Sequence, residues 1–191
     1  MNRGKLPFLM SGAALLGSLL LPYIFIVFTA PQYPDKSPKM YLHANALKGD
    51  LRDWEVVGRY IGIDVEPDLP EFDHNIVVFI VTILASLVWI SAFLSTRFKK
   101  IASVILLTTA ISMAGWAQYR LYQQGHNLDP SAPLRSVVKP FTPPLIGVTR
   151  VSKIKIYHLP HVGFLLFGLA CGITLYGAWW PKQEDGRRRR H

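Results

Sequence analysis

The chain has 191 residues, half of them hydrophobic, and its 21 lysines and arginines against 12 acidic residues leave a net charge of +9. The single cysteine, Cys171, excludes a disulfide within the chain and a cysteine-based metal site. Because the basic residues cluster just outside long apolar blocks, the charge indicates membrane topology, and we expect no nucleic-acid partner.

Four apolar blocks divide the chain, and each is close to the roughly 20 residues that a helix needs to cross a membrane. We therefore predict an all-α membrane protein with four transmembrane helices. Two extracytoplasmic polar segments, made of short strands and turns, are expected to pack together. The predicted transmembrane helices cover residues 7–30, 75–95, 101–121 and 161–180.

The first block, residues 7–30, carries no charge and has two interpretations. A cleaved signal peptide needs small residues one and three positions before the cut, and a cut after Ala30 places Phe28 at the minus-three position. An uncleaved helix fits the block better, with Pro22 expected to kink its second half.

The first polar segment, residues 31–74, has mixed local signals. Residues 39–46 partly alternate between polar and apolar side chains and are a candidate strand. Asp50 or Asp53 can cap a short helix, which Gly62 is expected to end.

The second polar segment, residues 122–160, follows the third apolar block. Its prolines exclude a helix through its middle and disfavour a central strand. Residues 148–157 then alternate imperfectly, and we expect a strand there.

The distribution of basic residues predicts the orientation of the chain. Three short stretches, the head 1–6, the link 96–100 and the tail 181–191, hold 10 of the 21 lysines and arginines. The positive-inside rule places these stretches and both termini in the cytoplasm, and both polar segments outside. We expect a multi-pass protein of a bacterial inner membrane, with membrane lipid around it.

A compact group of turn-forming residues begins the second polar segment: Gly125, His126, Asn127 and Asp129 with two prolines nearby. An imidazole, an amide and a carboxylate within five residues invite a catalytic interpretation. No nucleophile with a recognisable signature accompanies them, however, and we expect no enzyme. The alternative is an Asx turn, in which Asn127 or Asp129 accepts hydrogen bonds from nearby backbone amides.

Five of the six histidines fall in or beside the outer segments, and four of these join Met40 as candidate metal ligands. Imidazole and thioether groups suit Cu(I), so copper is the candidate metal, although no cofactor is certain. The alternative is that each histidine is an ordinary hydrogen-bonding residue at the membrane interface. The candidate ligands are Met40, His43, His126, His158 and His161.

Several short motifs occur in an order and spacing that resemble a known family. They are Ala30-Pro-Gln-Tyr-Pro34, Tyr60-Ile-Gly62, Gly125-His-Asn-Leu-Asp-Pro130 and Pro143-Pro-Leu-Ile-Gly147. Together they resemble a family of small polytopic membrane proteins encoded in bacterial nitrous-oxide-reductase gene clusters, beside a copper-delivery lipoprotein. The chain departs from that family at Arg59 and Ile63, where the family has His and Met, which indicates a diverged member.

The resemblance implies an accessory or assembly protein for a periplasmic respiratory metalloenzyme, most simply a copper enzyme. Its partners would be a periplasmic or membrane copper or haem enzyme, or the maturation factors of that enzyme. The alternative is a non-catalytic structural subunit of a membrane-bound respiratory oxidoreductase. The residues expected to form a docking turn are Gly125, Asn127, Asp129, Pro130, Pro143 and Pro144.

Overall fold

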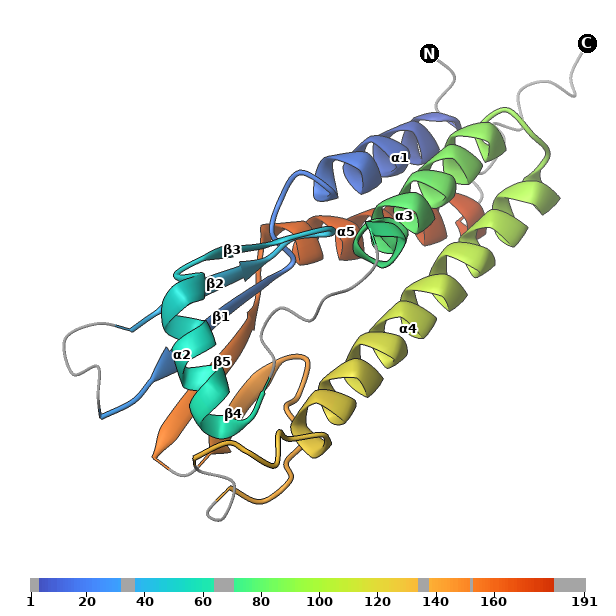
Figure 1. Cartoon of the computed structure of the whole chain (residues 1–191). Helices are drawn as coiled ribbons and strands as arrows, with labels where there is room; N and C mark the ends of the chain where they lie inside the picture. Colours follow the sequence, from blue (N-terminus) through green and yellow to red (C-terminus); the bar gives the residue numbers. More distant parts are fainter. Residues whose placement is uncertain (1–3, 32–36, 64–70, 134–137, 152, 181–191) are drawn as a thin grey trace, which may run out of the picture.

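The structure is a computed structural model that describes residues 4–31, 37–63, 71–133, 138–151 and 153–180, with 71–74 as backbone only. Within these residues, four helices run alongside one another at one end, and an antiparallel five-stranded sheet with a fifth helix forms the other end (Figure 1). In chain order the elements are α1 (Leu6–Ser18), β1 (Ile24–Thr29), β2 (Lys39–Leu42), β3 (Leu47–Gly49), α2 (Leu51–Ile61), α3 (Glu71–Ser91), α4 (Thr96–His126), β4 (Gly147–Val151), β5 (Ile154–Pro160) and α5 (Val162–Trp179).

The prediction of an all-α protein with four transmembrane helices is therefore wrong. The first apolar block splits: α1 ends at Ser18, and Ile24–Thr29 forms β1, the central strand of the sheet. Pro22 lies in the break between the two, where it cannot continue a helix. The β1 sequence Ile-Phe-Ile-Val-Phe-Thr consists of β-branched and aromatic residues, which pack well on a pleated surface.

The sheet has the strand order β3-β2-β1-β5-β4, and every neighbouring pair is antiparallel. In this register Ile26 of β1 lies opposite Met40 of β2 on one side and His158 of β5 on the other. β1 thus joins the two polar segments into one sheet. The expected strand at 39–46 is β2 followed by the turn that leads to β3, whereas the expected strand at 148–157 is a hairpin formed by β4 and β5.

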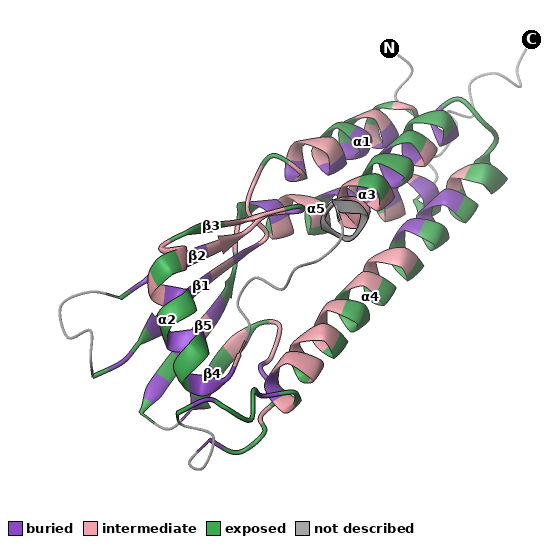
Figure 2. Cartoon of the chain, in the orientation of Figure 1, coloured by how far each residue is buried: buried purple, intermediate pink, exposed green. Residues whose placement is uncertain are grey.

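The core of this sheet layer forms where α2 covers one face of the sheet (Figure 2). Alternate residues of β1 are buried, and Phe28 is fully buried, with its ring edge-on to Trp54 of α2 at 4.7 Å between centroids. Gly62 ends α2 in a left-handed conformation (φ +89°), as the sequence predicted.

The helical end has its own apolar core, formed by α1, α3, α4 and α5. Ser11 of α1 donates a hydrogen bond to the carbonyl of Ala170 in α5 (2.8 Å), and Trp89 of α3 donates to the carbonyl of Leu9 (3.1 Å). These bonds connect α1 to the helices on both sides of it. The buried apolar residues of this core are Phe8, Leu15, Val81, Leu84, Ala85, Val88, Ala92, Leu106, Ala170 and Ala178.

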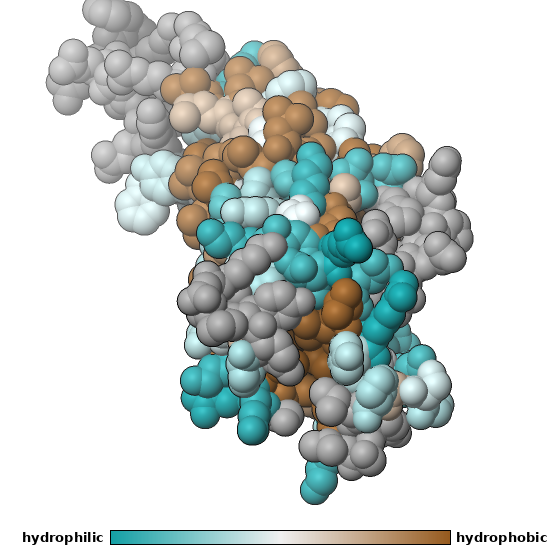
Figure 3. Space-filling view, turned by 60° about the vertical axis from the view of Figure 1, so that its left-hand side comes forward, coloured by the Kyte–Doolittle hydropathy of each residue, from teal (hydrophilic) through white to brown (hydrophobic). Residues whose placement is uncertain are grey.

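Two of the described helices, α4 and α5, are long and apolar enough to cross a membrane. The apolar helices α1 and 75–91 are shorter, and 13 residues make α1 only about 20 Å long against an apolar bilayer core of about 30 Å. Hydrophobic residues gather on the surface of the helical end, whereas hydrophilic residues are frequent over the sheet end (Figure 3).

Helix α4 is longer than the apolar block that predicted it. Residues 96–100 form its first turns, and it continues through Gly125 and His126, which composition had assigned to a turn. Residues 96–126 contain no proline, so nothing in the backbone interrupts the helix before Asn127. Because of this length, α4 reaches from the helical end to the side of the sheet.

Candidate functional site

The sheet separates Met40 from His43, although the two are three residues apart in the sequence. Met40 and His158 both lie opposite Ile26, so the three side chains share the buried face of the sheet. Alternate residues of a strand point to opposite faces, and Tyr41 lies on the other face of β2. His43 follows the end of β2 and approaches His161, whose ring lies 5.8 Å from that of Tyr41.

Among the histidines whose side chains the structure describes, the fold brings His43 and His161 near each other. Desolvation, followed by the nearby positive charges of Lys48 and His161, lowers the pKa of His43 and favours its neutral form. His161 lies at the start of α5, packs against Phe25 and Tyr41, and has a buried Nδ1 without a hydrogen-bond partner. Neutral imidazole is the form that binds metals. Across the described part of the chain, no three His, Cys, Asp or Glu residues form a group that could hold a metal ion.

His126 stands apart from this pair, in the last turn of α4. Its Nδ1 donates a hydrogen bond to the carbonyl of Tyr122 (2.9 Å), and its ring stacks on the ring of Tyr122 at 4.0 Å. Local contacts therefore account for the position of this histidine.

Two of the expected docking residues serve packing within the chain. Gly125 is buried, and its carbonyl accepts a hydrogen bond from the amide of Phe141 (3.1 Å). The side chain of Gln118 donates to the carbonyl of Pro143 and accepts from the amide of Leu145, both at 2.9 Å. The proline-containing stretch 138–145 is thereby held along the last turns of α4.

The prediction of an Asx turn at Asp129 is confirmed. Its Oδ1 accepts hydrogen bonds from the amide (2.8 Å) and the hydroxyl (2.7 Å) of Ser131, and these bonds lower the pKa of the exposed carboxyl group. The amide of Asp129 donates to the carbonyl of Gly62 (2.9 Å), which attaches the turn to the end of α2. Asn127 and Pro130 are exposed beside it, and Pro144 is half-buried.

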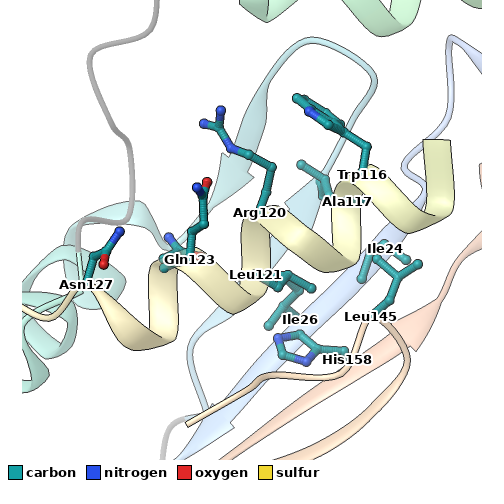
Figure 4. A pocket seen from close by; sticks show the side chains of 12 residues that line it. Ile24, Ile26, Trp116, Ala117, Arg120, Leu121, Gln123, Asn127, Leu145 and His158 are labelled. Atoms are coloured by element: carbon teal, nitrogen blue, oxygen red, sulfur yellow. The ribbon is translucent and has the colours of Figure 1, made fainter. Parts of the chain in front are cut away.

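A cavity of about 510 Å³ lies between α4 and the sheet (Figure 4). Its apolar wall comes from both sides, with Leu121 of α4 near Ile26 and His158 of the sheet. Its other polar side chains come from α4 and from Asn127, which follows the end of α4. The residues that line the cavity are Ile24, Ile26, Leu42, Trp116, Ala117, Arg120, Leu121, Gln123, Gln124, Asn127, Leu145 and His158.

Sequence reasoning placed only His158 and Asn127 among the candidate site residues of this cavity. The missed signal was helical spacing: Trp116, Arg120, Gln123 and Asn127 recur at intervals of three and four residues, which places them on one side of a helix. The predicted third helix ends at residue 121, before Gln123 and Asn127, so the prediction does not include the whole row.

The chain matches no protein-family model, and neither a curated protein nor a solved structure shows detectable similarity to it. The family resemblance of its motifs therefore stays a prediction.

Proposed function

We propose that this chain is a non-enzymatic accessory or assembly protein of a respiratory metalloenzyme, anchored in a bacterial inner membrane. The observation that carries the proposal is the division of the molecule into two parts. Two long apolar helices and their neighbours form one end, and a sheet layer with its own core forms the other. Such a sheet layer offers a partner enzyme a docking surface beside the membrane.

The arrangement of charges supports an orientation with the sheet layer on the periplasmic side. Both described ends of the chain and the α3–α4 connection lie at the end of the helices away from the sheet (Figure 1). There, the ammonium groups of Lys5, Lys99 and Lys100 each lie over an aromatic ring. Basic residues beside apolar helices favour the cytoplasmic side.

His43 and His161 are the residues that we propose for transient Cu(I) handling. They supply two nearby imidazoles, one with a free buried nitrogen, whereas Met40 faces the other side of the sheet. Cu(I) is a soft ion that imidazole and thioether ligands select. The metal would be cargo for the partner enzyme.

A Cu(I) titration of the purified protein against a competing chelator tests this role. The double variant His43→Ala, His161→Ala is expected to weaken Cu(I) binding by at least about tenfold. Removing a residue that only hydrogen-bonds to a metal ligand already lowers metal affinity by about that factor, and here both ligands are removed. His126→Ala is the matched control and should bind as the unmodified chain does. An unchanged affinity in the double variant would remove the copper role and leave the docking role standing.

A second candidate function is a structural subunit of a membrane-bound respiratory oxidoreductase, and one face of α5 favours it. A Cβ atom added at Gly168 or Gly172 would meet no atom within 4 Å, so packing within the chain does not require either glycine. Both line an apolar groove of about 520 Å³ beside Met10 of α1. Small residues four apart allow close approach of another membrane helix.

Purification in mild detergent separates this candidate from the first. A structural subunit is expected to co-purify in fixed stoichiometry with oxidoreductase subunits, and Gly168→Leu, Gly172→Leu should abolish the association without lowering the thermal stability of the chain. Isolation as a free small species, or an association that survives both substitutions, argues against a subunit held by this face.

A further inference from the structure

The sheet has a second face, opposite the one that α2 covers. Alternate residues of a strand point to opposite faces, and residues paired across neighbouring strands share a face. We call this second face the open face: it consists of Phe25, Val27 and Thr29 of β1 and the residues that the register pairs with them, directly or through β2 and β5. These side chains are exposed or half-buried, whereas those that alternate with them in β1 are buried.

The open face has a one-sided charge. No acidic residue occurs in any of the five strands, and Asp50, which follows β3, accepts a hydrogen bond from the backbone amide of Lys39 (3.0 Å). Arg150 lies directly opposite Lys155, and like charges in such a pair destabilise a sheet, so an anionic partner would relieve this repulsion. The exposed cations, none of which forms an ion pair with another described residue, are Lys39, Lys48, Arg150 and Lys155.

Apolar side chains lie between these cations. Phe25 and Val27 of β1 are opposite Leu159 and Tyr157 of β5. Leu159 is 44% exposed, and Val148, which is opposite Tyr157 on β4, is 48% exposed. An apolar centre with charges around it is the usual arrangement of an interface between proteins.

The direction of the open face favours a protein over a lipid surface as its occupant. Phe25 and Leu159 lie at the end of the sheet next to α1 and α5, whereas Arg150 and Lys155 lie toward the far end. The spacing of residues and strands gives the face a size of about 19 Å by 14 Å, with its length directed away from the helices. A bilayer around the helices would therefore not reach the far cations, whereas a protein beside the sheet would.

The open face also continues to the pair His43 and His161. The ring of His161 packs against those of Phe25 (6.4 Å) and Tyr41 (5.8 Å). A protein docked on the open face would thus lie beside the residues that we propose for Cu(I) handling.

We propose that the open face docks an acidic surface of the partner enzyme, in which carboxylates surround exposed apolar side chains. The carboxylates meet the four cations, and the apolar side chains cover Leu159 and Val148. The inference rests on the accessory role proposed above. A second copy of this chain fits poorly, because a net charge of +9 on each copy opposes their association.

The test uses a short fluorescein-labelled peptide of Glu-Glu-Leu-Leu repeats, in which each side of an extended chain presents carboxylates and leucines alternately. The matched control peptide has glutamine in place of every glutamate. Binding to the full chain in detergent is measured by fluorescence anisotropy at physiological ionic strength. The acidic peptide is expected to bind saturably and at least about tenfold more tightly than the control, because complementary charge selects the partner. Equal affinities, or no binding of the acidic peptide, would overturn the proposal.

Two charge-reversal variants locate the surface. Arg150→Glu with Lys155→Glu is expected to weaken binding of the acidic peptide at least about fivefold, since two attractions become repulsions. This variant keeps a like-charge pair in the sheet, so its fold is subject to the same repulsion as before. Arg52→Glu with Arg59→Glu makes the same change of net charge on exposed positions of α2, and screening should keep its effect below about twofold. An equal loss in both variants would indicate attraction to the overall charge and contradict a docking face.

Competitors and co-purification complete the test. Neither oligothymidylate nor phosphatidylglycerol added to the micelles should displace the peptide at equal concentration, and displacement by either would overturn a protein-binding surface. Neither copper nor a partner enzyme enters these measurements. Selective peptide binding without a co-purifying metalloenzyme would support the open face and count against the accessory role. A metalloenzyme that still co-purifies with the Arg150→Glu, Lys155→Glu variant would support the role and overturn this surface.

Discussion

Replacing Phe28 with alanine is expected to lower the free energy of unfolding of the sheet layer by about 3–5 kcal/mol, the usual loss for a buried phenylalanine. Phe28 is completely buried, and its ring meets that of Trp54 edge-on at 4.7 Å. The shortened side chain leaves a cavity between β1 and α2. Thermal unfolding in mild detergent, followed by tryptophan fluorescence, measures the loss.

Phe25→Ala is the matched control for this prediction. Phe25 is three residues away on the opposite face of β1, half-buried against Tyr41 at 5.1 Å, and its truncation should cost less than half as much. In a continuous transmembrane helix, residues three apart share a face. Equal losses at the two positions would therefore contradict the strand and favour the helix that the hydropathy of residues 7–30 predicts.

Gly125→Ala is expected to destabilise the junction between α4 and the sheet layer by about 2–3 kcal/mol, near the upper range for forcing an extra methyl group into a packed interior. A Cβ atom at Gly125 would overlap the carbonyl oxygen of Phe141 and press on Pro143. The backbone of 138–145 would have to move away, and the hydrogen bond from the amide of Phe141 would lengthen. Hydrogen exchange at that amide should accelerate.

Gly115→Ala on the same helix supplies the control. A Cβ atom there meets nothing within 4 Å, so the substitution should stabilise α4 by up to about 1 kcal/mol through helix propensity alone. The two variants are therefore expected to shift the melting temperature in opposite directions. A stabilising Gly125→Ala would show that the stretch 138–145 does not lie against α4.

The elements predicted well are those with a strong local signal. The apolar block at 161–180 contains α5 (Val162–Trp179), and Gly62 ends α2 as expected of a glycine after a short helix. The Asx turn at Asp129 also depends on nearby residues alone. In each case the stabilising contacts lie within a few positions along the chain, so the local sequence contains them.

The strand β1 could not be predicted from the local sequence. Residues 24–29 are as hydrophobic as a membrane helix, and apolar runs do not by themselves distinguish a buried strand from a helix. The strand is stabilised by Leu42 on one side and Pro160 on the other, 18 and 136 positions from their common partner Ile24. No window of local sequence contains both partners.

For the candidate site too, one part was predicted from the sequence and another part required the tertiary structure. Residue types alone identified imidazoles as the chemically interesting groups, and that interpretation depends only on the properties of each side chain. The sheet register then placed His158 beside a cavity and separated Met40 from His43. The length of α4 brought Arg120 and Gln123 to the same cavity, although 35 residues or more separate them from His158 in the chain.

The sequence by itself determined the apolar character of the helices, the turn at Asp129, the end of α2 at Gly62 and the chemistry available to the site, because these depend on composition and on neighbours along the chain. Only the tertiary structure decided that the first apolar block becomes a helix and a strand, and which histidines meet. Strand pairing and the burial of alternate side chains depend on distant residues, and their energies are realised only when the sheet has formed.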